Sequence, residues 1–431
     1  MLQRINFYKE MKYEDTKRNN FNCKKIFFRN RKNFPDFRKK RGIRYSFQLI
    51  IRMIIASIVN GIIELNKMKD FISSPSMVKY LEDLDYKGKC PKIGCLRIVI
   101  SHIPKDLLLK LNNEIKVIKE QVNEEKAIEN NIIKKSVKEN KGCFIKKNKS
   151  SNILLNLENK LNEISKIKDK EINFFNKRVI AFDGKAMRSG HLHCEKALMY
   201  LNGIFCDTGI PFIQELVDKK TNEIPVFRKG TKLLDLSGYL CTLDALHTQK
   251  ETAEYICEEK KGHYLFTVKN NQKCLLKMIK NEDLNNSKYD SETVEKGHGR
   301  IETRRIFVKE SSLDVREKFP HAQQVFLIER ISEHMSGGKI IKTTQEYCYC
   351  ITSLSKEQAS ASELLKYNRD HWAIENKLHY VLDVTFNEDK CRCYKAEMVS
   401  ALSILRKVAI HIYRANNITN IASGIRKINY S

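Results

Sequence analysis

Two short apolar runs that each end at an aspartate limit the fold of this chain more than any other feature. Residues 178–183 end at Asp183, and residues 239–244 end at Asp244. Runs of β-branched and apolar residues bounded by turn-forming residues predict buried strands. The sequence therefore predicts two strands of a sheet, each with a carboxylate at its end. A third acid, Glu375, lies inside a pattern of helical spacing.

Grouped together, these three acids would form a site for divalent cations. Mg²⁺ prefers oxygen ligands and keeps several of its waters, so a few carboxylates suffice for each ion. Two ions about 4 Å apart can stabilise both the attacking and the leaving oxygen of a phosphodiester displacement. The alternative for each acid is that it caps a helix or forms a turn, as acids after strands often do.

A series of motifs in one order resembles the H-repeat-associated group of insertion-sequence DDE transposases. The resemblance covers roughly residues 175–415 and implies a ribonuclease-H-like fold, with Asp183, Asp244 and Glu375 as the catalytic, metal-binding triad. It also implies two Mg²⁺ ions, which Mn²⁺ can replace. The motifs are IAFDGKAMR (180–188), DALHTQKETAE (244–254), LFTVKNNQ (265–272), GHGRIETR (297–304) and HWAIENKLH (371–379), followed by LDVTFNED (382–389).

The chain departs from relatives of this family at two places around the glutamate. Several related transposases carry an arginine four residues before it and a lysine seven residues after it, whereas this chain has His371 and Leu382. Asp383 is a further acid, eight residues after Glu375, that would support the ion site or replace Glu375 as a ligand. Trp372, the only tryptophan, is predicted to anchor the core; the alternative is a base-stacking role.

Polar side chains in the matched motifs are candidates for contact with DNA. Lys185, Lys269 and Gln272 are predicted to meet the phosphate backbone, a contact that positions DNA without reading its sequence. His298 and His371 are also assigned to this predicted DNA-binding set.

A predicted strand in segment 297–304 adds two arginines to that set. Arg300, Glu302 and Arg304 alternate with other residues and so share one face of the strand. Two arginines oriented by an acid would grip a phosphate group. The alternative is a surface salt-bridge ladder, which contributes little to stability.

The charge balance favours nucleic acid as the partner. The 431-residue chain has a formal net charge of +27, and residues 1–44 contain 15 Lys/Arg against 4 Asp/Glu. Such a field attracts polyanions. The aromatic residues interleaved with the basic ones in 1–44 suit a DNA-gripping arm, and a solvated extension is the alternative. Thirteen cysteines in an odd number, without a secretory signal, predict reduced thiols in a cytosolic protein.

The expected fold class is α/β: a ribonuclease-H-like mixed sheet flanked by helices, with a β-rich insertion and a small helical domain before it. Helices are expected near 47–68, 75–84 and 104–120, with 47–65 forming an amphipathic core helix and no membrane span. Ser355 and Gln358 predict a capping box that opens the helix carrying Glu375. The predicted domains are a basic arm (1–44), a helical domain (45–121), a Lys/Asn/Glu-rich connector (122–172) and a catalytic domain (173–416) with its insertion at about 285–352.

The strand predictions fill the catalytic region. Five strands are expected near 178–183, 196–205, 211–217, 239–244 and 263–269, and three more near 300–309, 323–331 and 340–352, with a hairpin at Gly337–Gly338.

These features predict a DDE transposase that cleaves and transfers DNA strands of an insertion sequence. Its expected partners are the double-stranded DNA of the element ends and of the target, bound by a homodimer in the cytoplasm at the nucleoid. Two alternatives stay open at this point. One is a ribonuclease-H-like nuclease without strand transfer, and the other is an inactive DNA-binding remnant.

Overall fold

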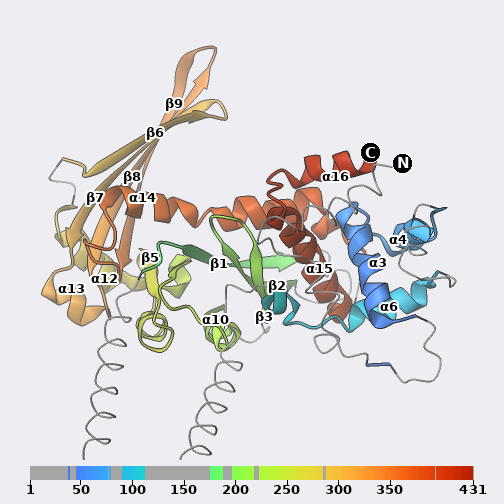
Figure 1. The fold of residues 1–431 in the computed structure, drawn as a ribbon. Helices are drawn as coiled ribbons and strands as arrows, with labels where there is room; N and C mark the ends of the chain where they lie inside the picture. The colour runs from blue at the N-terminus through green and yellow to red at the C-terminus, as the bar shows by residue number, and fades with distance from the viewer. Residues whose placement is uncertain are drawn as a thin grey trace, which may run out of the picture. The chain divides into compact units, whose positions relative to one another are not determined.

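The computed structural model describes residues 37–38, 45–75, 77–78, 90–111, 175–187, 197–217, 223–284, 288–393 and 395–430. The chain forms two compact units (Figure 1). The first unit contains residues 1–112, 180–230 and 369–431, and the second contains residues 113–179 and 231–368. The predicted mixed α/β class is confirmed, because both strands and helices contribute to each unit. The basic arm, apart from Phe37 and Arg38, and the connector 122–172 lie outside the described residues.

The first unit contains three antiparallel strands in the order β3-β2-β1. Their apolar side chains form a buried aromatic cluster in which Phe212 lies edge-on to Phe182 and beside Phe205. Gly203 is required in β2, since a Cβ there would lie 2.6 Å from a methyl group of Ile213. The strands are β1 (Val179–Met187), β2 (Leu198–Phe205) and β3 (Pro211–Val217).

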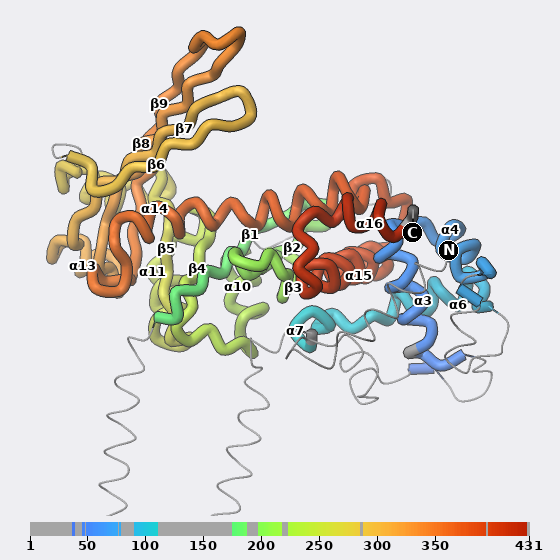
Figure 2. The backbone as a smooth tube through the Cα atoms, turned by 45° about the horizontal axis from the view of Figure 1, so that its top comes forward, coloured from blue at the N-terminus to red at the C-terminus, as the bar shows by residue number. Residues whose placement is uncertain are grey.

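Helices pack beside these strands around a nearly fully buried helix, α15 (Ala396–Ala415). Figure 2 shows α3 and α6 beside α15. The Tyr413 hydroxyl donates to the Val59 carbonyl, 2.6 Å away, and so ties α15 to the end of α3. The helices of this unit are α3 (Phe47–Val59), α4 (Leu65–Ile72), α6 (Ile93–Ser101), α7 (Leu107–Leu111), α10 (Glu223–Thr231), α15 and α16 (Ile421–Tyr430).

The prediction of one helix over 47–68 was wrong. Ser46 caps α3 by accepting a hydrogen bond from the Leu49 amide, but the helix ends at Val59. Gly61 has φ +74°, which breaks the helix before α4 begins. α6 was not predicted, and only 107–111 of the expected helix 104–120 is described as α-helix. Among the described residues, no helix is long and apolar enough to cross a membrane.

The second unit has a mixed sheet in the order β4-β5-β9-β8-β7-β6. Its β4–β5 pair is parallel, and every later pair is antiparallel. The predicted hairpin is confirmed, because Gly337 and Gly338 have positive φ between β8 and β9. β6 was not predicted. The strands are β4 (Leu240–Leu243), β5 (His263–Val268), β6 (Ser291–Gly297), β7 (Arg300–Glu310), β8 (Gln324–Ser336) and β9 (Lys339–Thr352).

Short helices complete the second unit and lead out of it. The predicted capping box at Ser355 is one turn too early. Its amide does bond to Gln358, but α14 begins at Ala361, where Ser360 and Glu363 bond reciprocally. The helical segments are η4 (Ala245–His247), α11 (Lys250–Glu254), η5 (Tyr255–Glu259), η6 (Asn270–Gln272), α12 (Lys273–Asn281), α13 (Leu313–Lys318) and α14 (Ala361–Asp370).

Candidate active site

Asp183 lies within β1 and not at its end. The strand continues to Met187 and pairs Asp183 with Asn202 of β2. The half-buried Asp183 side chain accepts a hydrogen bond from the Gly184 amide through Oδ1, at 2.9 Å. This local bond fixes the carboxylate against its own strand. The prediction of a strand ending at Asp183 was therefore wrong, although a strand does deliver the acid.

Glu375 and His379 bring two more ligand atoms to Asp183. His379 Nδ1 lies 3.0 Å from Glu375 Oε2 and 3.6 Å from Asp183 Oδ2. One ligand atom from each of these residues lies within 4.8 Å of the others, a spacing that suits a single cation. Carboxylate oxygens suit Mg²⁺, and an imidazole nitrogen suits transition metals better. The two carboxylates therefore fit a divalent ion, with the His379 imidazole beside them. The sequence places His379 four residues after Glu375, but it did not reveal that His379 also reaches Asp183.

The helix that carries Glu375 mixes α-turns with π-turns. Two π-turns follow one another, η8 (Glu375–His379) and η9 (Val381–Thr385), and η10 (Glu388–Lys390) comes after them. An α-turn holds 3.6 residues, whereas a π-turn closes with i→i+5 bonds and is wider. A helix that mixes both turns holds residues spaced by four in one line. Glu375, His379 and Asp383 have this spacing.

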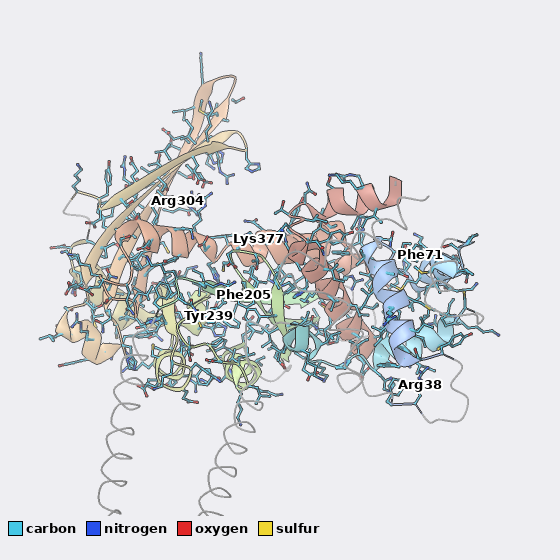
Figure 3. The ribbon with its side chains drawn as sticks, viewed as in Figure 1. Arg38, Phe71, Phe205, Tyr239, Arg304 and Lys377 are labelled. Atoms are coloured by element: carbon cyan, nitrogen blue, oxygen red, sulfur yellow. The ribbon has the colours of Figure 1, made fainter. Side chains whose placement is uncertain are left out.

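This helix is attached to the strands of the same unit through Lys377. Lys377, labelled in Figure 3, donates through Nζ to the carbonyl oxygens of Cys206 and Asp207, at 2.6 and 2.9 Å. These residues directly follow β2, where Phe205 ends the strand. The attachment fixes the helix next to the end of β2. β2 pairs with β1, the strand that carries Asp183.

His379 is buried beneath the two acids. Its side chain is 5% exposed. Burial, together with the positive charges of Lys185 and Lys407, lowers the pKa of His379 to about 3. The ring is therefore neutral near pH 7. Its second nitrogen, Nε2, is buried and has no hydrogen-bond partner among the described residues.

Lys185 and Asp383 form an ion pair beside this group. Lys185 Nζ lies 2.7 Å from both Asp383 oxygens, and the lysine side chain is 8% exposed. Burial raises the pKa of Asp383, and the hydrogen bond and charge of Lys185 oppose that shift. A phosphate contact by Lys185 would require this pair to open, so that role stays a prediction.

Glu223, at the start of α10, is a buried acid that the sequence did not single out. A Cβ added to Gly184 would overlap its carboxylate. Glu223 therefore lies directly over the β1 backbone, one residue from Asp183, and its charge also reaches His379. Motif reading could not find this contact, because nothing in segment 221–225 resembles a site.

Two cations of α15 lie beneath the group. Lys407 is fully buried and donates to Gln214 and Ser403 at 2.6 and 2.7 Å. Burial lowers the pKa of Lys407 to about 8. Arg406 lies 3.7 Å from Glu388, and both side chains are completely buried.

Asp244 belongs to the second unit, where it directly follows β4. Its side chain accepts a hydrogen bond from the Leu246 amide and caps η4. Gln272 Nε2 donates to the Thr248 carbonyl, and Asn271 donates to that of Ala245. The residues after β5 thus hold the loop that follows Asp244. The grouping of Asp244 with the other two acids stays a prediction, as does a DNA contact by Gln272.

The arginines predicted on one strand face do share it. In β7, whose Arg304 is labelled in Figure 3, Arg300 and Arg304 both bond to the Glu302 carboxylate. Burial pushes the pKa of Glu302 upward, but the bond from Arg300 and the charge of Arg304 outweigh it, and the pKa ends below its usual value. The three residues form the salt-bridge ladder that was given above as the alternative to phosphate binding. Binding of a phosphate group by the two arginines stays a prediction.

The remaining candidates lie in different parts of the chain. Lys269 is exposed after β5, and His298 has φ +49° in the exposed β6–β7 turn. His371 is half-buried just after α14. Their contacts with DNA stay predictions. The prediction that Trp372 anchors the core was wrong, since its side chain is 57% exposed.

Comparison with known proteins identifies the family. The profile of the family described as "Transposase DDE domain" matches residues 175–412. Two proteins of Escherichia coli K12 are similar over 261 residues, which is 58% of this chain and 67% of each relative. They are "Putative protein YbfL", at 30% identity, and "H repeat-associated putative transposase YhhI", at 29%. The resemblance to the H-repeat-associated group is thereby confirmed, and the chain belongs to the family of transposase DDE domains.

Proposed function

We propose that this chain is a transposase that cleaves and transfers DNA strands of an insertion sequence with the help of divalent metal ions. The observation that carries the proposal is the convergence of Asp183, Glu375 and His379 in a chain of the DDE family. In this proposal the fold is ribonuclease-H-like, and Asp244 of the second unit is the third acid of the triad. Mg²⁺ is the proposed ion.

The acids and their supports account for the proposed chemistry. When bound, two divalent ions would stabilise the charge on the attacking and leaving oxygens of the phosphodiester. Asp183 is held through Oδ1 by the Gly184 amide, with Oδ2 directed toward His379. Glu375 remains 53% exposed, so its carboxylate can reach an ion shared with a DNA phosphate. The Lys185 ammonium, which is 8% exposed and paired with Asp383, lies on the same strand as Asp183.

The proposed substrate is double-stranded DNA from the element ends and from the target, bound by a homodimer. The net charge of +27 supports a polyanionic partner. Arg300, whose side chain is 41% exposed, and the exposed Lys269 and His298 are the proposed phosphate contacts. Such contacts position DNA and make its binding depend on salt.

Neutral variants of the three acids test the triad. Asp183→Asn, Asp244→Asn and Glu375→Gln should each retain binding to element-end DNA and lose Mg²⁺-dependent cleavage by several orders of magnitude. The matched control is Glu397→Gln, an exposed acid at the start of α15, which should cleave like the wild type. Near wild-type cleavage by any triad variant would remove that residue from the site.

The products separate the proposal from its alternatives. A transposase joins the released 3′ ends to a target duplex, and sequencing of the products detects the junctions. Cleavage without junctions would indicate a nuclease. Wild-type protein that binds DNA and never cleaves it would indicate an inactive remnant.

A further inference from the structure

The contact between His379 and Glu375 has a definite donor. His379 Nδ1 lies 3.0 Å from Glu375 Oε2, within the range of a good hydrogen bond. Ionised carboxylate oxygens only accept hydrogen bonds. The hydrogen therefore sits on Nδ1, and the imidazole donates to the glutamate.

The two partners differ in how firmly they are held. The Glu375 side chain is 53% exposed, whereas that of His379 is 5% exposed. A long exposed side chain samples several rotamers, and fixing it has an entropic cost. The packed imidazole has lost that freedom already. A rigid donor thus restrains a flexible acid, on the side where Asp183 Oδ2 lies 3.6 Å from the same nitrogen.

The second nitrogen argues against His379 as a metal ligand. A histidine that binds a metal usually donates its other ring N–H to an acceptor. Nε2 is buried and has no partner among the described residues. Coordination through Nδ1 would place an unpaired N–H at this buried position, which is rare in proteins. Donation through Nδ1 leaves only a lone pair there.

We propose that His379 is a positioning residue, whose Nδ1–H holds the Glu375 carboxylate opposite Asp183 in the orientation that receives the metal ion. The proposal rests on the proposed function, because it assigns a task within the same site. His379 acts on the ion only through Glu375. Partners of this kind typically change metal affinity or activity by about 10- to 100-fold when removed.

Three substitutions of His379 test whether a hydrogen-bond donor at the position of Nδ1 is what the site needs. The amide nitrogen of asparagine is attached to Cγ, like Nδ1, whereas that of glutamine lies one bond farther out. Mn²⁺ binding to the full chain without DNA, followed by electron paramagnetic resonance, is the measurement. We expect His379→Asn to bind within about 3-fold of the wild type, and His379→Gln and His379→Leu to bind about 10- to 100-fold more weakly. Equal losses in the Asn and Gln variants would overturn the proposal.

A double-mutant cycle tests whether His379 acts through the glutamate. In a Glu375→Gln background, adding His379→Leu should cause no further loss of Mn²⁺ binding. A further loss as large as in the wild-type background would show a direct ligand and overturn the positioning role. Thermal unfolding of each variant identifies losses of Mn²⁺ binding that come from misfolding. If His379→Leu is misfolded, the comparison of His379→Asn with His379→Gln tests the proposal, because these two side chains differ least in polarity.

Failure of the proposed function gives a different result. If the wild type binds Mn²⁺ and Glu375→Gln binds it equally well, the site itself is misassigned, and the role of His379 falls with it. If Glu375→Gln loses binding while His379→Leu keeps it, only the inference about His379 is wrong.

Discussion

Lys185 Nζ lies 2.7 Å from both carboxylate oxygens of Asp383, although the two residues are 198 positions apart in the chain. The lysine is almost completely buried, whereas a third of the aspartate side chain is exposed. Removing one member of such a pair leaves the other charge without a partner in a desolvated place. The pair thus connects β1 to the helix of Glu375. Replacing only one of the two residues should therefore destabilise the protein.

Asp383→Asn should destabilise the chain by about 2 kcal/mol, below the 3–5 kcal/mol of fully buried pairs because Asp383 is partly exposed. The double variant Lys185→Met with Asp383→Leu should recover most of that loss, since no buried charge then lacks a partner. Denaturant unfolding followed by circular dichroism measures both. A double variant less stable than Asp383→Asn would contradict the buried-pair explanation.

Gly184→Ala should destabilise the first unit by about 1–3 kcal/mol, because the added methyl group overlaps the Glu223 carboxylate. Shortening the partner in Gly184→Ala with Glu223→Ala should restore much of the stability. The double variant Gly184→Ala with Glu223→Gln keeps the volume of the side chain, so it should not relieve the overlap. Thermal unfolding of the four proteins tests this, and equal melting temperatures for the glutamine and alanine double variants would refute a steric cause.

The stability of the wild type relative to Lys407→Met should rise between about pH 8 and pH 10.5. Burial lowers the pKa of Lys407 to about 8 in the folded chain, from a usual 10.5. Between these values the unfolded chain holds more protons, so the free energy of unfolding increases with pH, by about 3 kcal/mol in all. Below pH 8 both states are charged and the difference is constant. Unfolding of the wild type and of both lysine variants across this range measures it, and the exposed Lys67→Met should show no such change.

Arg300→Ala with Arg304→Ala should weaken DNA binding and reduce its dependence on salt, with about one unit lost from the log–log slope for each phosphate contact removed. The free energy of unfolding should change little, since partly exposed ion pairs contribute about 0–1 kcal/mol each. Arg316→Ala, an exposed arginine of α13 in the same unit, is the matched control. An unchanged slope together with a large loss of stability would show that the ladder is purely structural.

Strands were the part of the fold that the sequence predicted best. Apolar runs such as 179–183 and 263–268 bury both faces, and their composition alone marks them. The extension of β1 past Asp183 was not visible, because Gly184 usually signals a turn. Gly184 leaves room for the carboxylate of Glu223, which lies 39 positions later in the chain. A contact between residues so far apart leaves no signal in the local sequence.

The candidate site was predicted in part for the same reason. The motif around Glu375 placed that acid on a helix, and helical spacing placed His379 beside it. The π-turns were not predictable, since a hydrophobic pattern does not show which hydrogen bonds close a turn. Trp372 was misassigned because large aromatic residues are usually buried, and only the fold shows which face of a helix is left uncovered.

The π-turns have a consequence for insertions and deletions. Each π-turn closes over one more residue than an α-turn does. Loss of one residue within Val381–Thr385 can be absorbed when that turn closes as an α-turn, so the segment that follows Thr385 keeps its direction. The same deletion in a regular helix such as α15 would rotate everything beyond it by about 100°. A chain one residue shorter at this place can therefore still bring Glu388 and the residues after it to the same position beneath the site.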